Sequence, residues 1–84
     1  MHHVYFPKGV CSTRIDFDIE NNTIHNVKYT NGCNGNLQAV GRLVEDMTTD
    51  EAVKRLKGIC CGPNTTSCGD QLARAIEQAK SEEN

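Results

Sequence analysis

Residues 12–23 read STRIDFDIENNT, which predicts a strand followed by a tight turn. The apolar residues Ile15, Phe17 and Ile19 alternate with polar ones, and this two-residue period is typical of a strand that buries one face. Asn21-Asn22 follows the alternating run, and asparagine tolerates the positive φ angles of a two-residue hairpin turn. We therefore expect a β-hairpin whose second strand begins directly after the turn.

The rest of the chain predicts one more strand before this hairpin and three helices after it. The expected strands cover residues 4–6, 12–20 and 23–30, and the expected helices cover residues 35–47, 48–58 and 67–79. In the first helix Leu37, Val44 and Met47 recur at helical spacing, and Thr48 and Glu51 have the spacing of a capping box at the start of the second. Strands followed by helices predict a single α+β domain over residues 1–84, a three-stranded antiparallel sheet followed by three helices packed on one face.

Five cysteines in 84 residues lie beside glycines or turn signals: Cys11, Cys33, Cys60, Cys61 and Cys68. A cysteine that only fills the core would lie within an apolar periodic run. The start of the chain lacks the apolar core and cleavage site of a secretory signal, and an odd number of cysteines disfavours a full set of disulfides. Metal ligation is therefore favoured over disulfide bonding, with redox or catalytic thiols as the smaller alternative.

Cys33 and Cys68 lie at the starts of expected helices, where backbone N–H groups and the helix dipole favour the thiolate form that binds zinc or iron. Four thiolates suit a closed tetrahedral zinc site or a Cys₄ iron–sulfur cluster. The cysteines form no C-x₂-C pair, so the fold must bring them together. Hydrogen bonds to the thiolates could come from Gln71, Asn34 and Asn36, whereas surface positions are favoured over ligand roles for His2, His3 and His25.

The segments around these cysteines resemble a known family. Gly58-Ile59-Cys60-Cys61-Gly62 followed by Thr66-Ser67-Cys68-Gly69-Asp70-Gln71-Leu72 is similar to the TSCPD domain, and Gly32-Cys33-Asn34-Gly35-Asn36-Leu37 is similar to the signature of its small stand-alone, four-cysteine branch. The resemblance spans nearly the whole chain, with Gly69 where the name-giving motif has proline. It implies that the metal ligands are Cys11, Cys33, Cys61 and Cys68, with Cys60 as the additional cysteine.

The resemblance implies an accessory role. The TSCPD domain is found at the C-terminal end of many cobalamin-dependent ribonucleotide reductases, as a cysteine module apart from the catalytic barrel, for which this chain has no room. We expect a metal-binding accessory or interaction module without reductase activity of its own, with zinc as the first choice of metal and an iron–sulfur cluster as the second. The open alternatives are a thiol redox protein using Cys60, Cys61 and Cys68, or a cluster carrier. The cluster-carrier alternative is based on a distant resemblance to U-type iron–sulfur scaffold proteins, in which histidine stands at the position of Ser67.

Charge and hydropathy limit the classes of partner. The formal net charge is −2 and no Lys/Arg cluster is present, which disfavours binding to nucleic acid. No apolar stretch is long enough for a membrane span. We therefore expect a cytoplasmic protein, and the resemblance to an accessory domain implies a protein partner. The oligomeric state does not follow from the sequence.

Overall fold

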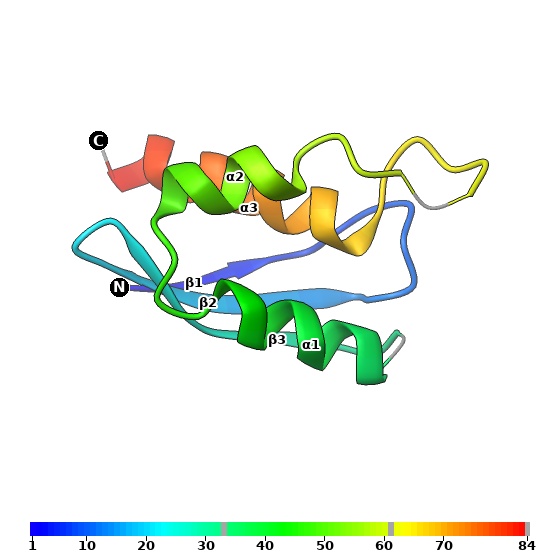
Figure 1. Ribbon diagram of the computed structural model, residues 1–84, viewed down its shortest axis with the longest axis horizontal. Helices are drawn as coiled ribbons and strands as arrows, with labels where there is room; N and C mark the ends of the chain where they lie inside the picture. The colour runs from blue at the N-terminus through cyan, green and yellow to red at the C-terminus, as the bar shows by residue number, and fades with distance from the viewer. Residues whose placement is uncertain (33, 61, 84) are drawn as a thin grey trace.

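A computed structural model describes residues 1–32, 34–60 and 62–83 of the chain (Figure 1). The strands are β1 (His2–Tyr5), β2 (Arg14–Glu20) and β3 (Thr23–Thr30), and the helices are α1 (Asn34–Val44), α2 (Thr49–Leu56) and α3 (Cys68–Glu83). The strands pair antiparallel in the order β1-β2-β3. This architecture confirms the predicted α+β fold. Among the described residues, no helix combines the length and the apolar character needed to cross a membrane.

The hairpin between β2 and β3 turns where the sequence predicts. Asn21 and Asn22 have φ angles of 53° and 63°, so both adopt the left-handed conformation that a two-residue hairpin turn requires. Thr23 then begins β3, and its hydroxyl donates to the carbonyl oxygen of Glu20 at 2.6 Å. The turn thereby fixes the register of the two strands.

A bulge in β3 reconciles the sequence of this strand with a single buried face. The register shifts between Asp16 and Asp18, where β3 has one more residue than β2. The additional residue is Asn26, whose φ angle is 57°. Because the bulge changes the phase of the strand, Ile24 before it and Val27 after it both pack into the core.

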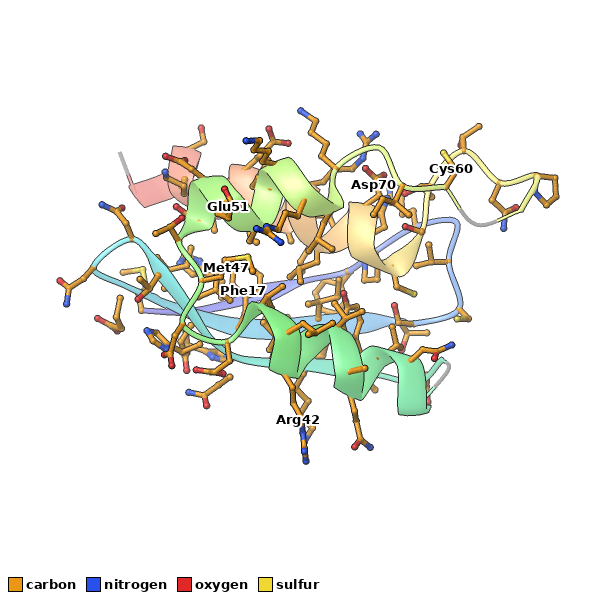
Figure 2. All side chains as sticks on the ribbon, in the orientation of Figure 1. Phe17, Arg42, Met47, Glu51, Cys60 and Asp70 are labelled. Atoms are coloured by element: carbon orange, nitrogen blue, oxygen red, sulfur yellow. The ribbon has the colours of Figure 1, made fainter. Side chains whose placement is uncertain are left out.

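The hydrophobic core lies between one face of the sheet and the helices. Ile15, Phe17 and Ile19 of β2 are at most 5% exposed, as their alternation predicts. Each helix contributes to the same cluster: Val44 from α1, Ala52 from α2, and Leu72, Ala75, Ile76 and Ala79 from α3. The three helices therefore cover one face of the sheet, and Figure 2 shows Phe17 in the layer between sheet and helices.

The first helix is shorter than predicted, because α1 ends at Val44 and does not reach Met47. Asp46 has a left-handed φ of 66°, which is incompatible with a continuing helix. The following segment pairs with β3: the N–H of Asp46 donates to the carbonyl of Ile24 at 2.8 Å, and the N–H of Ile24 donates to the carbonyl of Met47 at 2.9 Å. The prediction that Met47 lies on this helix is therefore wrong, although its half-buried side chain still packs against the core.

Helix α1 lies along β3, close to the backbone of that strand. A Cβ added to Gly41 would lie 3.0 Å from the carbonyl oxygen of Val27, so only glycine allows this approach without a shift. The next helix begins as predicted, with the hydroxyl of Thr48 accepting from the N–H of Glu51 at 3.2 Å. The connection between α1 and α2 is thus fixed at both ends.

Candidate metal centre

Two of the four predicted ligands, Cys11 and Cys68, lie within the described residues, whereas Cys33 and Cys61 lie outside them. Cys11 is exposed in the loop between β1 and β2, and Cys68 is half-buried at the first residue of α3. The loop that carries Cys11, the connection after β3 and the start of α3 gather at one end of the sheet, on the right in Figure 1. The fold therefore brings three segments that are distant in sequence to one end of the molecule.

Contacts with neighbouring residues place the two described thiols in one region. The hydroxyl of Ser12, which is only 2% exposed, lies 3.4 Å from the Sγ of Cys68. A Cβ added to Gly32 would lie 3.2 Å from the Sγ of Cys11. Residues adjacent to Cys11 and to Cys33 in the chain thus contact the thiols of Cys68 and Cys11. The convergence of all four ligands stays a prediction, since Cys33 and Cys61 lie outside the described residues.

Tyr29 fixes the start of α3 against the sheet. Its hydroxyl donates to the backbone carbonyl of Cys68 at 2.9 Å. Burial, together with the nearby thiol of Cys68, raises the pKa of Tyr29 above its ordinary value. The phenol therefore stays protonated at neutral pH and remains a hydrogen-bond donor. The backbone position of Cys68 is consequently tied to β3.

Gln71 links the Cys11 loop to α3. Its Oε1 accepts from the backbone N–H of Lys8 at 3.1 Å, and its Nε2 donates to the hydroxyl of Thr66 at 2.9 Å. From the sequence, Gln71 either donates hydrogen bonds to the thiolates or serves only in turns and helix caps, and the second role is favoured. The structure instead shows Gln71 fixing the loop that carries Cys11, which positions the thiol indirectly.

Asp70 fixes the segment 58–66, which carries Cys60 and Cys61. The carboxylate is fully buried and accepts from the N–H of Gly58 at 2.7 Å, the hydroxyl of Thr66 at 2.5 Å and the Nε of Arg74 at 2.8 Å. Burial alone would raise the pKa of Asp70, but these donors outweigh it and lower the pKa to about 2. Figure 2 shows Asp70 beside this segment.

The sequence favours helix capping for Asp70, and the structure assigns capping to another residue. The hydroxyl of Ser67 accepts from the N–H of Asp70 at 3.1 Å, which is the hydrogen bond of an N-cap. The Asp70 carboxylate is thereby left to hold the preceding loop at both of its ends. The sequence does indicate one partner of Asp70, because Arg74 follows it at the i,i+4 spacing of a helical ion pair. No sequence pattern indicates that Asp70 also accepts from Gly58.

Cys60 differs from Cys11 and Cys68 in its surroundings. Its side chain is exposed, and its Sγ donates to the carbonyl of Gly58 at 3.5 Å. No disulfide joins Cys11, Cys60 and Cys68 to one another. These three thiols are thus not cross-linked to one another.

The comparison with known families confirms the resemblance that the sequence motifs indicate. The family model of the TSCPD domain matches residues 1–80. The chain belongs to the TSCPD family. No curated protein and no solved structure matches it.

The donor chemistry of this TSCPD domain fits a soft or borderline metal ion. Sulfur ligands select zinc, Cu(I) and iron–sulfur clusters over magnesium or calcium. Cys68 lies at the first turn of α3, where the helix dipole favours negative charge. The buried hydroxyl of Ser12 is within hydrogen-bond distance of the same sulfur, and such contacts orient and tune a thiolate ligand.

A substitution at Gly32 tests how tightly this end of the TSCPD domain is packed. We expect Gly32→Ala to lower the free energy of unfolding by about 1–3 kcal/mol, because the residue has a φ of 99° and its new Cβ would lie 2.9 Å from Leu37 and 3.2 Å from the Cys11 sulfur. Urea denaturation provides the measurement. Gly35→Ala is the matched control, since a Cβ there meets nothing within 4 Å. Equal stabilities of the two variants would contradict the packing described here.

Proposed function

We propose that this chain is a four-cysteine metal-binding accessory module of the TSCPD family, with Cys11, Cys33, Cys61 and Cys68 as ligands. The observation that carries the proposal is the placement of Ser12 and Gly32. Ser12 follows Cys11 in the chain and contacts Cys68, while Gly32 precedes Cys33 and lies against Cys11. Three of the four proposed ligands thus belong to segments that meet at one end of the sheet.

Zinc is the metal that we propose first, and an iron–sulfur cluster is the second choice. Four thiolates close the coordination shell of zinc, and a closed site contributes to folding rather than to turnover. When bound, the metal would supply a cross-link between the Cys11 loop, the connection after β3, the segment 58–66 and α3. Two hydrogen bonds to α3 support this proposal, because Gln71 accepts from Lys8 in the Cys11 loop and Asp70 accepts from Gly58 in the segment 58–66.

The proposed role of the module is to bind another protein in the cytoplasm. Phe6 and Ile59 are 65% and 50% exposed, and they lie in the segments that carry Cys11 and Cys60. Exposed apolar side chains in the segments of a metal site are suited to contact with a protein surface, whereas the net charge of −2 is unsuited to nucleic acid. A link to ribonucleotide reductase is part of this proposal and is supported by the occurrence of the domain in the cobalamin-dependent enzymes.

Metal analysis of anaerobically purified protein, together with its ultraviolet-visible spectrum, tests the proposal. The expected result is about one zinc ion per chain and no absorbance in the visible range, because zinc has a filled d shell. A brown protein that contains iron and sulfide would show that the bound group is an iron–sulfur cluster and not zinc. Metal-free protein whose thiols form a reversible disulfide would overturn it in favour of a redox role.

A further inference from the structure

A second group of metal-ligand side chains lies near the hairpin, away from the cysteines. The ligand atoms of His25, Glu45 and Asp46 all lie within 4.8 Å of one another. The Nδ1 of His25 is 3.0 Å from Oε2 of Glu45 and 3.0 Å from Oδ1 of Asp46. One ring nitrogen thus faces two carboxylates at once.

Thr23 determines which nitrogen of this histidine carries a proton. Its hydroxyl donates its single hydrogen to the carbonyl of Glu20 at 2.6 Å, so it must accept at its other contact, with the Nε2 of His25 at 2.7 Å. Nε2 therefore carries a hydrogen, which leaves Nδ1 as the ring atom that can bind a metal ion. A cation shared among Nδ1 and the two carboxylates, whether a proton or a metal ion, holds the three groups together.

Backbone hydrogen bonds position the two acidic residues beside the ring. The second oxygen of Glu45, Oε1, accepts from the N–H of Asn26 at 2.8 Å, so this carboxylate itself is held in place. For Asp46 it is the backbone that is held, because its N–H donates to the carbonyl of Ile24 in β3. The Glu45 carboxylate is therefore already positioned for binding, whereas the exposed Asp46 side chain can still adjust.

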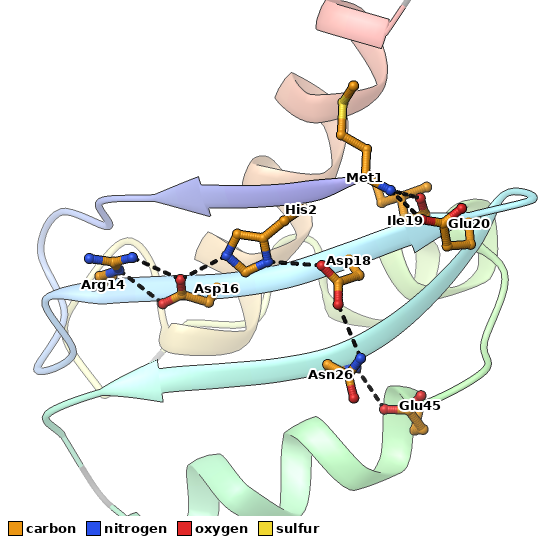
Figure 3. A network of polar contacts seen from close by, with 9 residues as sticks. All are labelled: Met1, His2, Arg14, Asp16, Asp18, Ile19, Glu20, Asn26 and Glu45. Atoms are coloured by element: carbon orange, nitrogen blue, oxygen red, sulfur yellow. Dashed lines mark hydrogen bonds and ion pairs between the residues drawn. The ribbon is translucent and has the colours of Figure 1, made fainter.

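The other histidine that contacts two carboxylates is arranged differently. In Figure 3, His2 bridges two aspartates, with Nδ1 at 2.8 Å from Asp18 and Nε2 at 3.1 Å from Asp16. Each nitrogen therefore has one carboxylate of its own, and no single ion can lie between all three groups. His2 provides an internal control for His25.

We propose that His25, Glu45 and Asp46 form a binding site for a divalent transition-metal ion of the zinc class, separate from the cysteines. Imidazole nitrogen and carboxylate oxygen are ordinary zinc ligands, and two carboxylates neutralise the charge of the ion. Tetrahedral zinc separates its ligand atoms by about 3.3 Å, so the 3.0 Å separations require only a small expansion. Asp46 is 78% exposed at its side chain and can make this adjustment, and water completes the shell.

The test follows the ring nitrogens of His25 by ¹⁵N nuclear magnetic resonance while Zn²⁺ is added to the full chain. Zinc is supplied until the number of thiols that react with a disulfide reagent falls no further, and the titration is then continued. We expect the Nδ1 resonance of His25 to shift on ligation, while the resonances of His2 do not. Because the signals are assigned to residues, metal binding by the cysteines does not affect the result.

Matched variants separate ligation from structure. Asp46→Asn keeps a residue that accepts the left-handed conformation but removes a charged ligand, and we expect it to weaken zinc binding by at least about tenfold. Thr23→Val removes the group that fixes the tautomer, and we expect a loss of about tenfold together with a change in the His25 tautomer signals. His2→Gln should bind zinc at His25 unchanged. An Nδ1 signal that does not respond to zinc, or equal affinity in Asp46→Asn, would overturn the proposal.

Discussion

Asp70→Asn is expected to lower the free energy of unfolding by about 2–4 kcal/mol, although the two side chains have nearly the same size. The asparagine amide can replace one accepting oxygen, but its NH₂ group would face a donor where the carboxylate accepts. Loss of the charge also weakens the contact with Arg74 at 2.8 Å, but that side chain is 52% exposed and can bond to water instead. The larger cost comes from the buried donor that loses its acceptor, and a buried group left without a partner has a cost of this order.

Urea denaturation of the two proteins at neutral pH measures the effect. Asp50→Asn is the matched control, because the Asp50 side chain is 90% exposed and forms a surface ion pair with Lys80 at 3.1 Å. An exposed pair of this kind contributes little, so the control should unfold like the original protein. If Asp70→Asn were as stable as the control, the carboxylate could not be the element that holds the segment 58–66.

The pH dependence of stability provides an independent measurement of the same interaction. The pKa of Asp70 is about 2 in the folded protein, against 3.8 as its ordinary value. Since the folded value is the lower one, the stability that Asp70 contributes is fully present above pH 3.8 and is lost as the pH falls through about 2. This part of the acid-induced loss should be missing in Asp70→Asn, whose side chain does not titrate.

The strands and the order of the elements were predictable because they depend on local patterns. Ile15, Phe17 and Ile19 alternate without interruption, and Asn21-Asn22 is a turn signal by itself. The bulge at Asn26 was not predictable, since it depends on how β3 fits between β2 and the helices. The end of α1 was not predictable either. The helical spacing of Met47 predicts a helix that continues past Val44, but in the fold the residues after Val44 pair with β3 instead.

The sequence identifies the cysteines as candidate ligands, but it does not identify the groups that position Cys11 and Cys68. Glycines beside thiols are visible in the sequence, and Gly32 does lie against the Cys11 sulfur. The link from Gln71 to Lys8 spans 63 residues, and the link from Asp70 to Gly58 spans 12. Such pairs have no periodic signal, because only the folded chain decides which backbone N–H meets which side chain.

Removal of metal is expected to lower the melting temperature by about 10–20 °C, and Cys68→Ser should produce the same loss without a chelator. A ligand that binds only the folded state stabilises it by about 2.7 kcal/mol at a hundred times its dissociation constant. For a domain of 84 residues, each kcal/mol corresponds to about 4–8 °C. Calorimetry with and without a zinc chelator measures the shift directly.

Cys68→Ser isolates the sulfur from the fold. Serine can keep the contact with the hydroxyl of Ser12 at 3.4 Å and can begin α3, so the metal-free variant should fold like the metal-free original protein. Cys60→Ser is the matched control: we expect its metal content and melting temperature to match the original protein, because Cys60 is exposed and bonded only to its own loop. Metal bound to Cys68→Ser at full stoichiometry, or a melting temperature insensitive to the chelator, would exclude Cys68 as a ligand. If Cys60→Ser lost the metal instead, Cys60 would be a ligand in place of Cys61.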